Sequence, residues 1–293
     1  MVAQSGWDPA SLTELLTSLN REVHLRQETE RKPSFFDTHP PTDDRAAKTA
    51  AYPKSLTRVS REPISASPEA FMRRLDGLVV GPRAANGVVQ GSTFQHPDLN
   101  FFVELPEGWK VQNSPRKIVA VVDNGEAVVV LGTVAEGNDP LEGARLLEKN
   151  GERTDIVSRT SRTTIGDLPA ARTELSVEGK AMLDLTWIAH GGLIYQIGGL
   201  ATTKQFDAMK PVFEKVASSF RLLTQSERAG ITETRIRLVA GRDGESIEDL
   251  RQRTGSAWSN EEIAVANGLS VSDRIRQGQL LKIAKTETYI SNK

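Results

Sequence analysis

The chain has 293 residues, enough for two or three domains, and its formal net charge at pH 7 is −1. This charge balance gives no reason to expect nucleic acid or an anionic membrane as a partner. Cysteine is absent, which excludes disulfides and thiolate metal sites and fits either the cytoplasm or the periplasm. No apolar run approaches the roughly 18 residues that a membrane span needs, and no basic region precedes an apolar one at the N-terminus, so no signal peptide is predicted.

Residues 1–51 are predicted to form a helical segment. Asp8 can cap a helix that has Pro9 in its first turn and runs to about residue 30. A second short helix is expected at residues 42–51, and residues 52–91 are read as a linker and a helix. Leucines at helical spacing give the first helix one apolar face, which we expect another domain or a partner to cover; they are Leu12, Leu15, Leu16 and Leu19.

Residues 92–223 change to a pattern of strands. The pair Asn124-Gly125 between two apolar runs predicts a hairpin with a type I′ turn. A strand is expected at residues 154–165, followed by a meander of three strands and a closing helix at residues 203–220. The predicted fold class is α+β, with an antiparallel sheet flanked by helices in an α/β/α sandwich.

Residues 224–234 are read as a polar linker, and residues 235–285 as a small third domain in the order β-α-α-β. Ser259 to Ala266 is its second predicted helix, and Asn267-Gly268 supplies the C-cap that a helix end requires.

The N-terminal segment resembles the end of the catalytic domain in HtpX-like and BepA-like zinc metallopeptidases of the CAAX prenyl protease clan. The resemblance lies in Gly-Trp-Asp-Pro at residues 6–9 and SFFDTHPPTDDR at residues 34–45. Those enzymes hold zinc with H-E-x-x-H and a later Glu; the motif supplies two imidazoles one helical turn apart and a Glu base. The motif is absent here, because no two of the histidines lie four apart; they are His24, His39, His96 and His190.

The resemblance implies a metal role for His39 only in a longer parent enzyme, where this histidine would reach the catalytic zinc as an extra ligand on a loop stiffened by Pro40 and Pro41. The alternative is that His39 packs or hydrogen-bonds locally. Arg45 is interpreted as a structural partner for a carboxylate. No catalytic residue and no cofactor are assigned to this chain, and zinc is expected for the parent enzyme alone.

The middle segment resembles the sandwich of the PsbP and Mog1 type, through residues 94–101, LPEGW at 105–109, IGDLPAAR at 165–172 and SFR at 219–221. The third domain resembles LysM, with GES at residues 244–246, NGL at 267–269 and IRQGQLL at 275–281. LysM domains bind N-acetylglucosamine polymers such as peptidoglycan between two loops. The residues that the resemblance places there are Gly244, Glu245, Ser246, Ile247, Asn267, Gly268, Leu269 and Ile275.

Two readings of function follow. In the first, the chain is the non-catalytic C-terminal part of a secreted or periplasmic zinc metalloendopeptidase, with a LysM-like module for cell-wall glycan or partner binding. In the second, it is a stand-alone scaffold or peptidoglycan-binding protein derived from that family. Both readings place the chain in the bacterial envelope. A third possibility is that the sandwich binds a small ligand, although no residue pattern in the sequence marks a binding site there.

Because two His ligands and the base are missing, the purified chain is expected to cleave no casein and to carry no zinc. A casein assay and elemental analysis check this expectation, and either proteolysis or stoichiometric zinc would contradict it.

Overall fold

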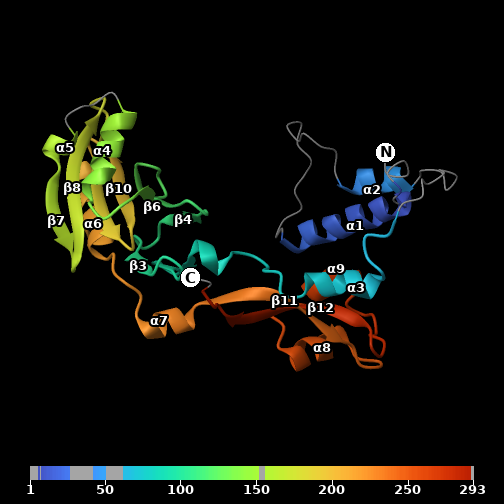
Figure 1. Ribbon diagram of the computed structural model, residues 1–293. Coiled ribbons are helices and arrows are strands. Elements are labelled where there is room, and N and C mark those ends of the chain that lie inside the picture. Colours follow the sequence, from blue (N-terminus) through green and yellow to red (C-terminus); the bar gives the residue numbers. More distant parts are fainter. Residues whose placement is uncertain (1–5, 7, 27–41, 51–61, 152–155, 292–293) are drawn as a thin grey trace. The chain divides into compact units, whose positions relative to one another are not determined.

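The computed structural model describes residues 6, 8–26, 42–50, 62–151 and 156–291 (Figure 1). It divides into two compact units that each combine distant parts of the chain. Unit 1 comprises Met1–Gly81 and Thr234–Glu287, and unit 2 comprises Pro82–Glu233 and Thr288–Lys293.

Unit 2 is built on a seven-stranded sheet in the order β4-β5-β6-β10-β9-β8-β7, in which each strand pairs antiparallel with its neighbours. Tight turns with positive φ connect β8 to β9 through Glu178-Gly179 and β9 to β10 through Gly191-Gly192; such turns match the natural twist of the strands. The strands are β4 (Lys110–Asn113), β5 (Lys117–Val121), β6 (Ala127–Glu136), β7 (Ser161–Ile165), β8 (Leu168–Val177), β9 (Ala181–His190) and β10 (Leu193–Thr202).

The central strands bury both of their faces. Along β10, Ile194 packs into one core and Tyr195 into the other. On β9, Trp187 and Ile188 divide in the same way. Successive side chains of a strand point to opposite sides, so this alternation requires a layer of helix on each face.

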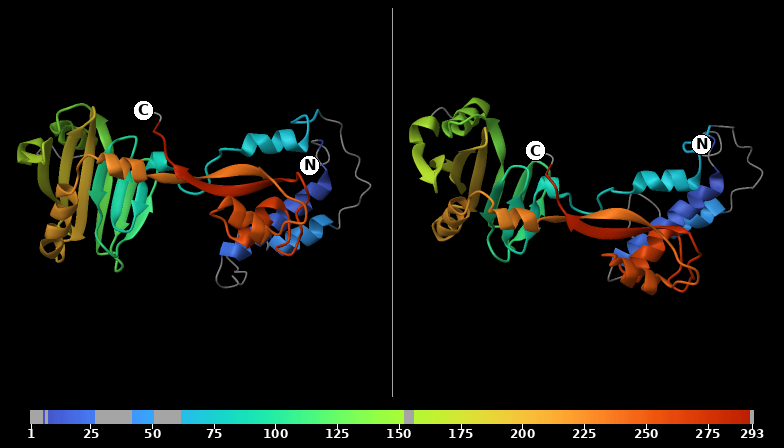
Figure 2. Two further views of the ribbon diagram at one scale, coloured as in Figure 1. Left: turned by 90° about the horizontal axis from the view of Figure 1, so that it is seen from below. Right: turned by 60° about the horizontal axis from the view of Figure 1, so that its bottom comes forward.

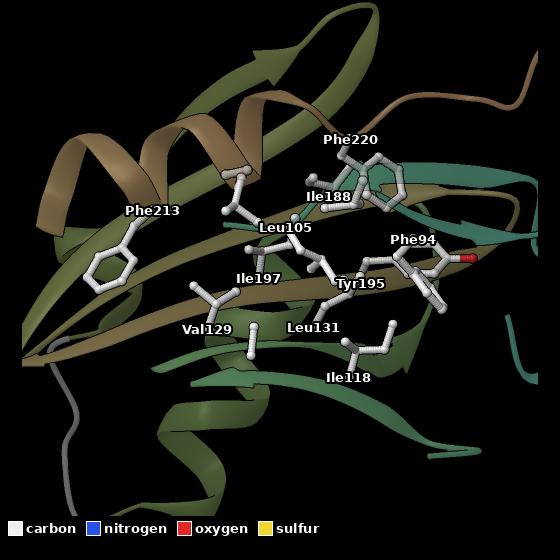
Figure 3. Close-up of a cluster of buried hydrophobic side chains, with 14 of the residues drawn as sticks. Phe94, Leu105, Ile118, Val129, Leu131, Ile188, Tyr195, Ile197, Phe213 and Phe220 are labelled. Carbon is white, nitrogen blue, oxygen red and sulfur yellow. The ribbon is translucent and has the colours of Figure 1, made fainter. Parts of the chain in front are cut away.

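Helices supply both layers. α6 (Phe206–Ser218) covers the core that contains Tyr195, while α4 (Leu141–Asn150) and α5 (Ile156–Arg159) cover the core that contains Trp187 (Figures 1 and 3). An antiparallel sheet flanked by helices on both faces is the α+β sandwich that the PsbP/Mog1 resemblance implies, so the predicted fold class is confirmed.

Unit 2 also contains a three-stranded antiparallel sheet and a second small core. Phe94 and Phe101 of this sheet pack into the α6-side core. Ala84 and Ile231 lie in the small core, both almost fully buried. The elements here are η3 (Ala84–Asn86), β1 (Val88–Gln90), β2 (Thr93–His96), β3 (Phe101–Glu104) and α7 (Gln225–Gly230).

Helix α7 lies in the segment that the sequence suggested was a linker. The Thr224 hydroxyl accepts a hydrogen bond from the Glu227 amide, and the Glu227 carboxylate accepts one from the Thr224 amide. This capping box starts the helix, and burial of Ile231 in the small core fixes its end. The polar composition of residues 224–234 therefore reflects an exposed helix.

Two local predictions are wrong. Asn124 keeps a negative φ in the β5–β6 hairpin, where its side chain accepts a hydrogen bond from the Glu126 amide, so the turn is not type I′. The strand expected at residues 154–165 begins only at Ser161, because Ile156 is buried against the sheet as part of α5.

Unit 1 contains the β-α-α-β element, in which β11 and β12 form a two-stranded sheet (Figure 2). Ser246 and Ser259 cap its two helices, and Gly255 and Gly268 end them in the left-handed conformation. The apolar positions of both helices pack on Leu281 and neighbouring residues to form a core. The bounds are β11 (Thr232–Ala240), α8 (Ile247–Thr254), α9 (Asn260–Asn267) and β12 (Leu280–Thr288).

The remaining elements of unit 1 come from the N-terminal third of the chain. Leu16 of the first helix is 3% exposed, whereas Leu15 and Leu19 are 54% and 48% exposed. Leu12 is half-buried. The elements are α1 (Pro9–Arg26), α2 (Thr42–Ala50), α3 (Pro68–Met72) and η2 (Arg73–Leu75).

The close approach of α6 to β10 yields the first structural test. A Cβ atom on Gly199 would lie 2.2 Å from Cγ of Phe213, so Gly199→Ala is expected to destabilise unit 2 by about 1–3 kcal/mol through overpacking. The matched control is Gly230→Ala, since a Cβ there would meet nothing within 4 Å. Hydrogen exchange of the β9 and β10 amides measures both changes, and equal protection in the two variants would contradict the packing argument.

Candidate functional site

The two loops that the LysM resemblance assigned to glycan binding lie side by side in unit 1. The Gly244 amide donates to the Ile275 carbonyl at 3.0 Å, and the Ile275 amide donates to the Glu245 carbonyl at 2.9 Å. The Gly241 amide donates to the Gln279 carbonyl at 2.8 Å, and the Asp243 amide to Oε1 of Gln277 at 3.1 Å. The loop before α8 and the loop before β12 are thus joined by backbone bonds.

These bonds use groups that a ligand would otherwise need. The amides of Gly244 and Ile275 are committed to the opposite loop, and the Ser246 hydroxyl donates to Asp249 at 2.6 Å. The side chains of Ile247 and Ile275 are 0% and 1% exposed and belong to the core. These four residues of the predicted glycan site therefore hold the two loops in place.

The other predicted residues, at the end of α9, also have partners within the chain. The Asn267 side chain donates to the carbonyls of Ile263 and Lys282 and accepts from the Lys282 amide, each at 2.8 Å. Gly268 is the left-handed C-cap of α9. Leu269 packs against the core, and its carbonyl accepts a hydrogen bond from the Arg21 guanidinium of α1. Asn267 therefore ties α9 to β12.

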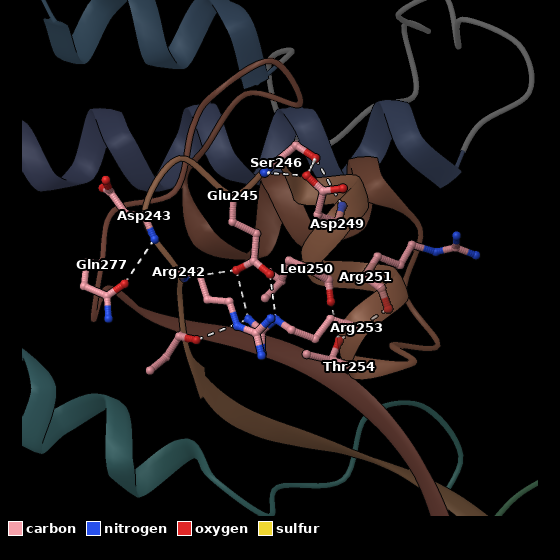
Figure 4. A network of polar contacts seen from close by, with 11 residues as sticks. Arg242, Asp243, Glu245, Ser246, Asp249, Leu250, Arg251, Arg253, Thr254 and Gln277 are labelled. Atoms are coloured by element: carbon pink, nitrogen blue, oxygen red, sulfur yellow. Dashed lines mark hydrogen bonds and ion pairs between the residues drawn. The ribbon is translucent and has the colours of Figure 1, made fainter.

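Glu245 is the centre of a polar network (Figure 4). Its carboxylate accepts from Nε of Arg253 at 2.6 Å, from Nη2 at 2.9 Å and from the Arg242 amide at 3.1 Å. The Glu245 side chain is 5% exposed, and that of Arg253 is 25% exposed. Hydrogen bonds from Arg253 hold the pKa of Glu245 below its ordinary value. The pair clamps the β11–α8 loop to the end of α8.

A groove of about 530 Å³ lies between α3 and the turn at residues 276–280, within the size range of ligand sites in proteins. The amide nitrogens of Gln277 and Gln279 make no hydrogen bond to a described residue, although both Oε1 atoms accept backbone amides. Sequence reasoning missed this site because its walls are far apart in the chain. The groove is lined by Pro68, Glu69, Met72, Arg276, Gln277, Gly278, Gln279 and Leu280.

The residues linked to zinc by resemblance are not brought into a described site. His39 lies outside the described residues, and of Arg45 only the backbone is described, in α2. Within the described ranges, no three His, Asp or Glu side chains gather as a metal-binding group. Over the same ranges, no helix combines the length and apolar character needed to traverse a bilayer.

Comparison with known proteins gives partial structural likenesses. No protein-family model and no curated protein matches the chain. A structure from Bacteroides thetaiotaomicron is 15% identical with a TM-score of 0.34, covering 59% of this chain and 65% of its own, so the chain spans just under two thirds of that protein. Cyanobacterial PsbP from Synechocystis is 14% identical with a TM-score of 0.35, covering 49% of this chain and 99% of its own.

A third likeness is to LpqN, a protein involved in cell envelope biogenesis of Mycobacterium tuberculosis. It is 13% identical with a TM-score of 0.30, covering 55% of this chain and 100% of its own. At these values the likenesses carry no argument about ligand, partner or activity.

The Glu245–Arg253 pair makes a pH-dependent prediction. Folding lowers the pKa of Glu245, so the pair stabilises the protein above the unfolded pKa of about 4.3, and this contribution is lost as the pH falls through the folded value. Arg253→Met leaves a buried carboxylate without its partner and is expected to cost about 2 kcal/mol at pH 7. The cost should shrink as the pH falls through the folded pKa of Glu245, because the carboxyl group then becomes protonated.

Urea unfolding of unit 1, followed by NMR at several pH values, measures this difference. Arg251→Met is the matched control, because Arg251 lies in the same helix and, among the described residues, its side chain donates to the Trp258 carbonyl alone. A destabilisation by Arg253→Met that did not change with pH would contradict the role of the carboxylate.

Proposed function

We propose that the chain is a non-catalytic module of the bacterial envelope whose β-α-α-β element binds an N-acetylglucosamine polymer such as peptidoglycan. The observation that carries this proposal is the groove of about 530 Å³ between α3 and residues 276–280. It adjoins the loops named by the LysM resemblance, because the Gln277 side chain and the Gln279 carbonyl accept hydrogen bonds from the β11–α8 loop.

The chemistry of the groove suits a neutral polar chain. Gln277 and Gln279 each offer an amide nitrogen that has no described partner, and such donors match sugar hydroxyls and acetamido carbonyls. Glu69 and Arg276 contribute one charge of each sign, which favours a neutral ligand over a polyanion. Met72 offers apolar surface for an acetamido methyl group.

The Gly244 and Ile275 amides already donate hydrogen bonds within the chain, which supports placing the glycan in the groove. A sugar seated directly between Gly244 and Ile275 would have to displace two backbone hydrogen bonds, each of which contributes about 0.5–1.5 kcal/mol. The groove requires no such exchange. We therefore assign glycan contact to the turn at residues 276–280 and a supporting role to the loops behind it.

The second candidate is the non-catalytic C-terminal part of a periplasmic zinc metalloendopeptidase, favoured by the exposed leucines of α1. Leu15 and Leu19 are about half exposed on a single helix face, which fits a contact with a catalytic domain. In such a parent enzyme, zinc would activate water for peptide hydrolysis. Immunoblotting of source cells tests this candidate: a band well above 32.1 kDa supports it, and a band at 32.1 kDa contradicts it.

Removal of both groove carboxamides tests the glycan proposal. The double variant Gln277→Ala/Gln279→Ala is expected to weaken binding of N-acetylglucosamine hexamer about tenfold, since each net hydrogen bond contributes about 0.5–1.5 kcal/mol. Calorimetric titration measures the affinity, and circular dichroism verifies that the variant is folded. Gln252→Ala is the matched control, because Gln252 lies on α8 outside the groove.

A second variant separates loss of binding from loss of loop structure. Met72→Trp fills the groove from α3 without touching the hydrogen bonds of the two loops, and it should also abolish binding. The proposal fails if the native chain binds neither the hexamer nor insoluble peptidoglycan, or if both groove variants bind as tightly as Gln252→Ala.

A further inference from the structure

Unit 2 contains a small cavity that none of the sequence patterns indicated. Its volume is about 50 Å³, which holds about four water-sized groups. Its walls come from β2, β3, β5, β6 and β10, and the exposed turn between β4 and β5 forms one side. The apolar part of the lining includes Phe94, Leu99, Phe101, Ile118, Leu131 and Tyr195, and the His96 ring also lines the cavity.

Tyr195 gives this cavity a polar end. Its side chain is 1% exposed, and its ring packs on Phe101 and Phe220 with centroids 5.0 and 5.3 Å away. The hydroxyl oxygen lies at the end of the aromatic cluster beside Phe94 (Figure 3). No hydrogen bond joins it to a described residue, and it is not among the fully buried polar atoms that lack a partner. The hydroxyl is therefore open to the cavity, where it can donate a hydrogen bond to water or to a bound group that displaces the water.

The charge around the cavity has one sign. Arg116 and Lys117 are among the lining residues, and no Asp or Glu is. Both cations are exposed, and neither forms an ion pair with a described residue. Burial raises the pKa of Tyr195 to about 12, so the hydroxyl keeps its proton at neutral pH and remains a donor.

The turn that carries the cations is fixed in place. Asn113 donates from its side chain to the carbonyls of Asn86 and Gly87 at 3.2 and 2.9 Å. Ser114 donates from its hydroxyl to the Lys117 carbonyl at 2.7 Å, and its amide donates to the same carbonyl at 3.0 Å. The cavity is therefore preformed, which reduces the entropic cost of binding.

We propose that this cavity binds a short-chain monocarboxylate. The apolar tail packs against Phe94, Phe101 and Leu131, and the carboxylate accepts a hydrogen bond from the Tyr195 hydroxyl in the field of Arg116 and Lys117. A charge-assisted bond to a carboxylate is stronger than one to a neutral acceptor, and the single sign of charge excludes an amine. The volume limits the tail to one or two carbons.

The test uses propionate as the probe and the complete chain as the protein. Two-dimensional NMR titration is expected to give saturable shifts confined to the amides around the cavity, and propylammonium of equal size should give none. Tyr195→Phe removes only the hydroxyl and should weaken propionate binding about tenfold, the effect of losing one charge-assisted bond. Its melting temperature should not fall, because the hydroxyl has no described partner.

The cations are tested separately. Arg116→Gln/Lys117→Gln should weaken propionate binding and reduce its dependence on salt. The matched control is Lys204→Gln, because Lys204 lies beyond the opposite end of β10 from Tyr195. The proposal is overturned if propionate gives no saturable shifts, if Tyr195→Phe binds as well as the native chain, or if the hydroxyl contacts only a water that propionate does not displace.

Discussion

The burial of both faces of β9 and β10 is the constraint on which unit 2 depends. Trp187 and Ile194 point into one core, and Ile188 and Tyr195 point into the other. A shift of one residue in register would exchange these sets, so the pairing of the central strands is strongly specified. The helices follow from it, since each must cover one of the two apolar faces.

The two units differ in where their polar side chains lie and in what those side chains bind. In unit 2, alternation directs Tyr195 into a core, where its ring is satisfied by packing and its hydroxyl ends at a cavity. In unit 1, the small β-α-α-β element has only a few core side chains and relies on polar bonds for its loops. Glu245, Arg253 and Asn267 serve that purpose, so groups that look suited to ligand binding are already used.

Some elements of the fold could be predicted from the sequence, and others could not. The meander and the caps of α8 and α9 were predictable, because short turns and Ser caps depend on neighbouring residues alone. Helix α7 was missed, since its polar sequence resembles a linker until burial of Ile231 is known. The turn at Asn124 was misassigned because the side chain binds the Glu126 amide instead of favouring a left-handed backbone.

The sequence by itself determined the α+β class, the antiparallel meander and the absence of disulfides, because these depend on local periodicity and composition. Only the tertiary structure decided which polar groups are hydrogen-bonded within the chain and which can bind a ligand. The groove of unit 1 joins residues about 200 positions apart, from Glu69 to Gln279, and the cavity of unit 2 joins Phe94 to Tyr195. Such sites arise from packing between distant segments, which no local pattern of residues encodes.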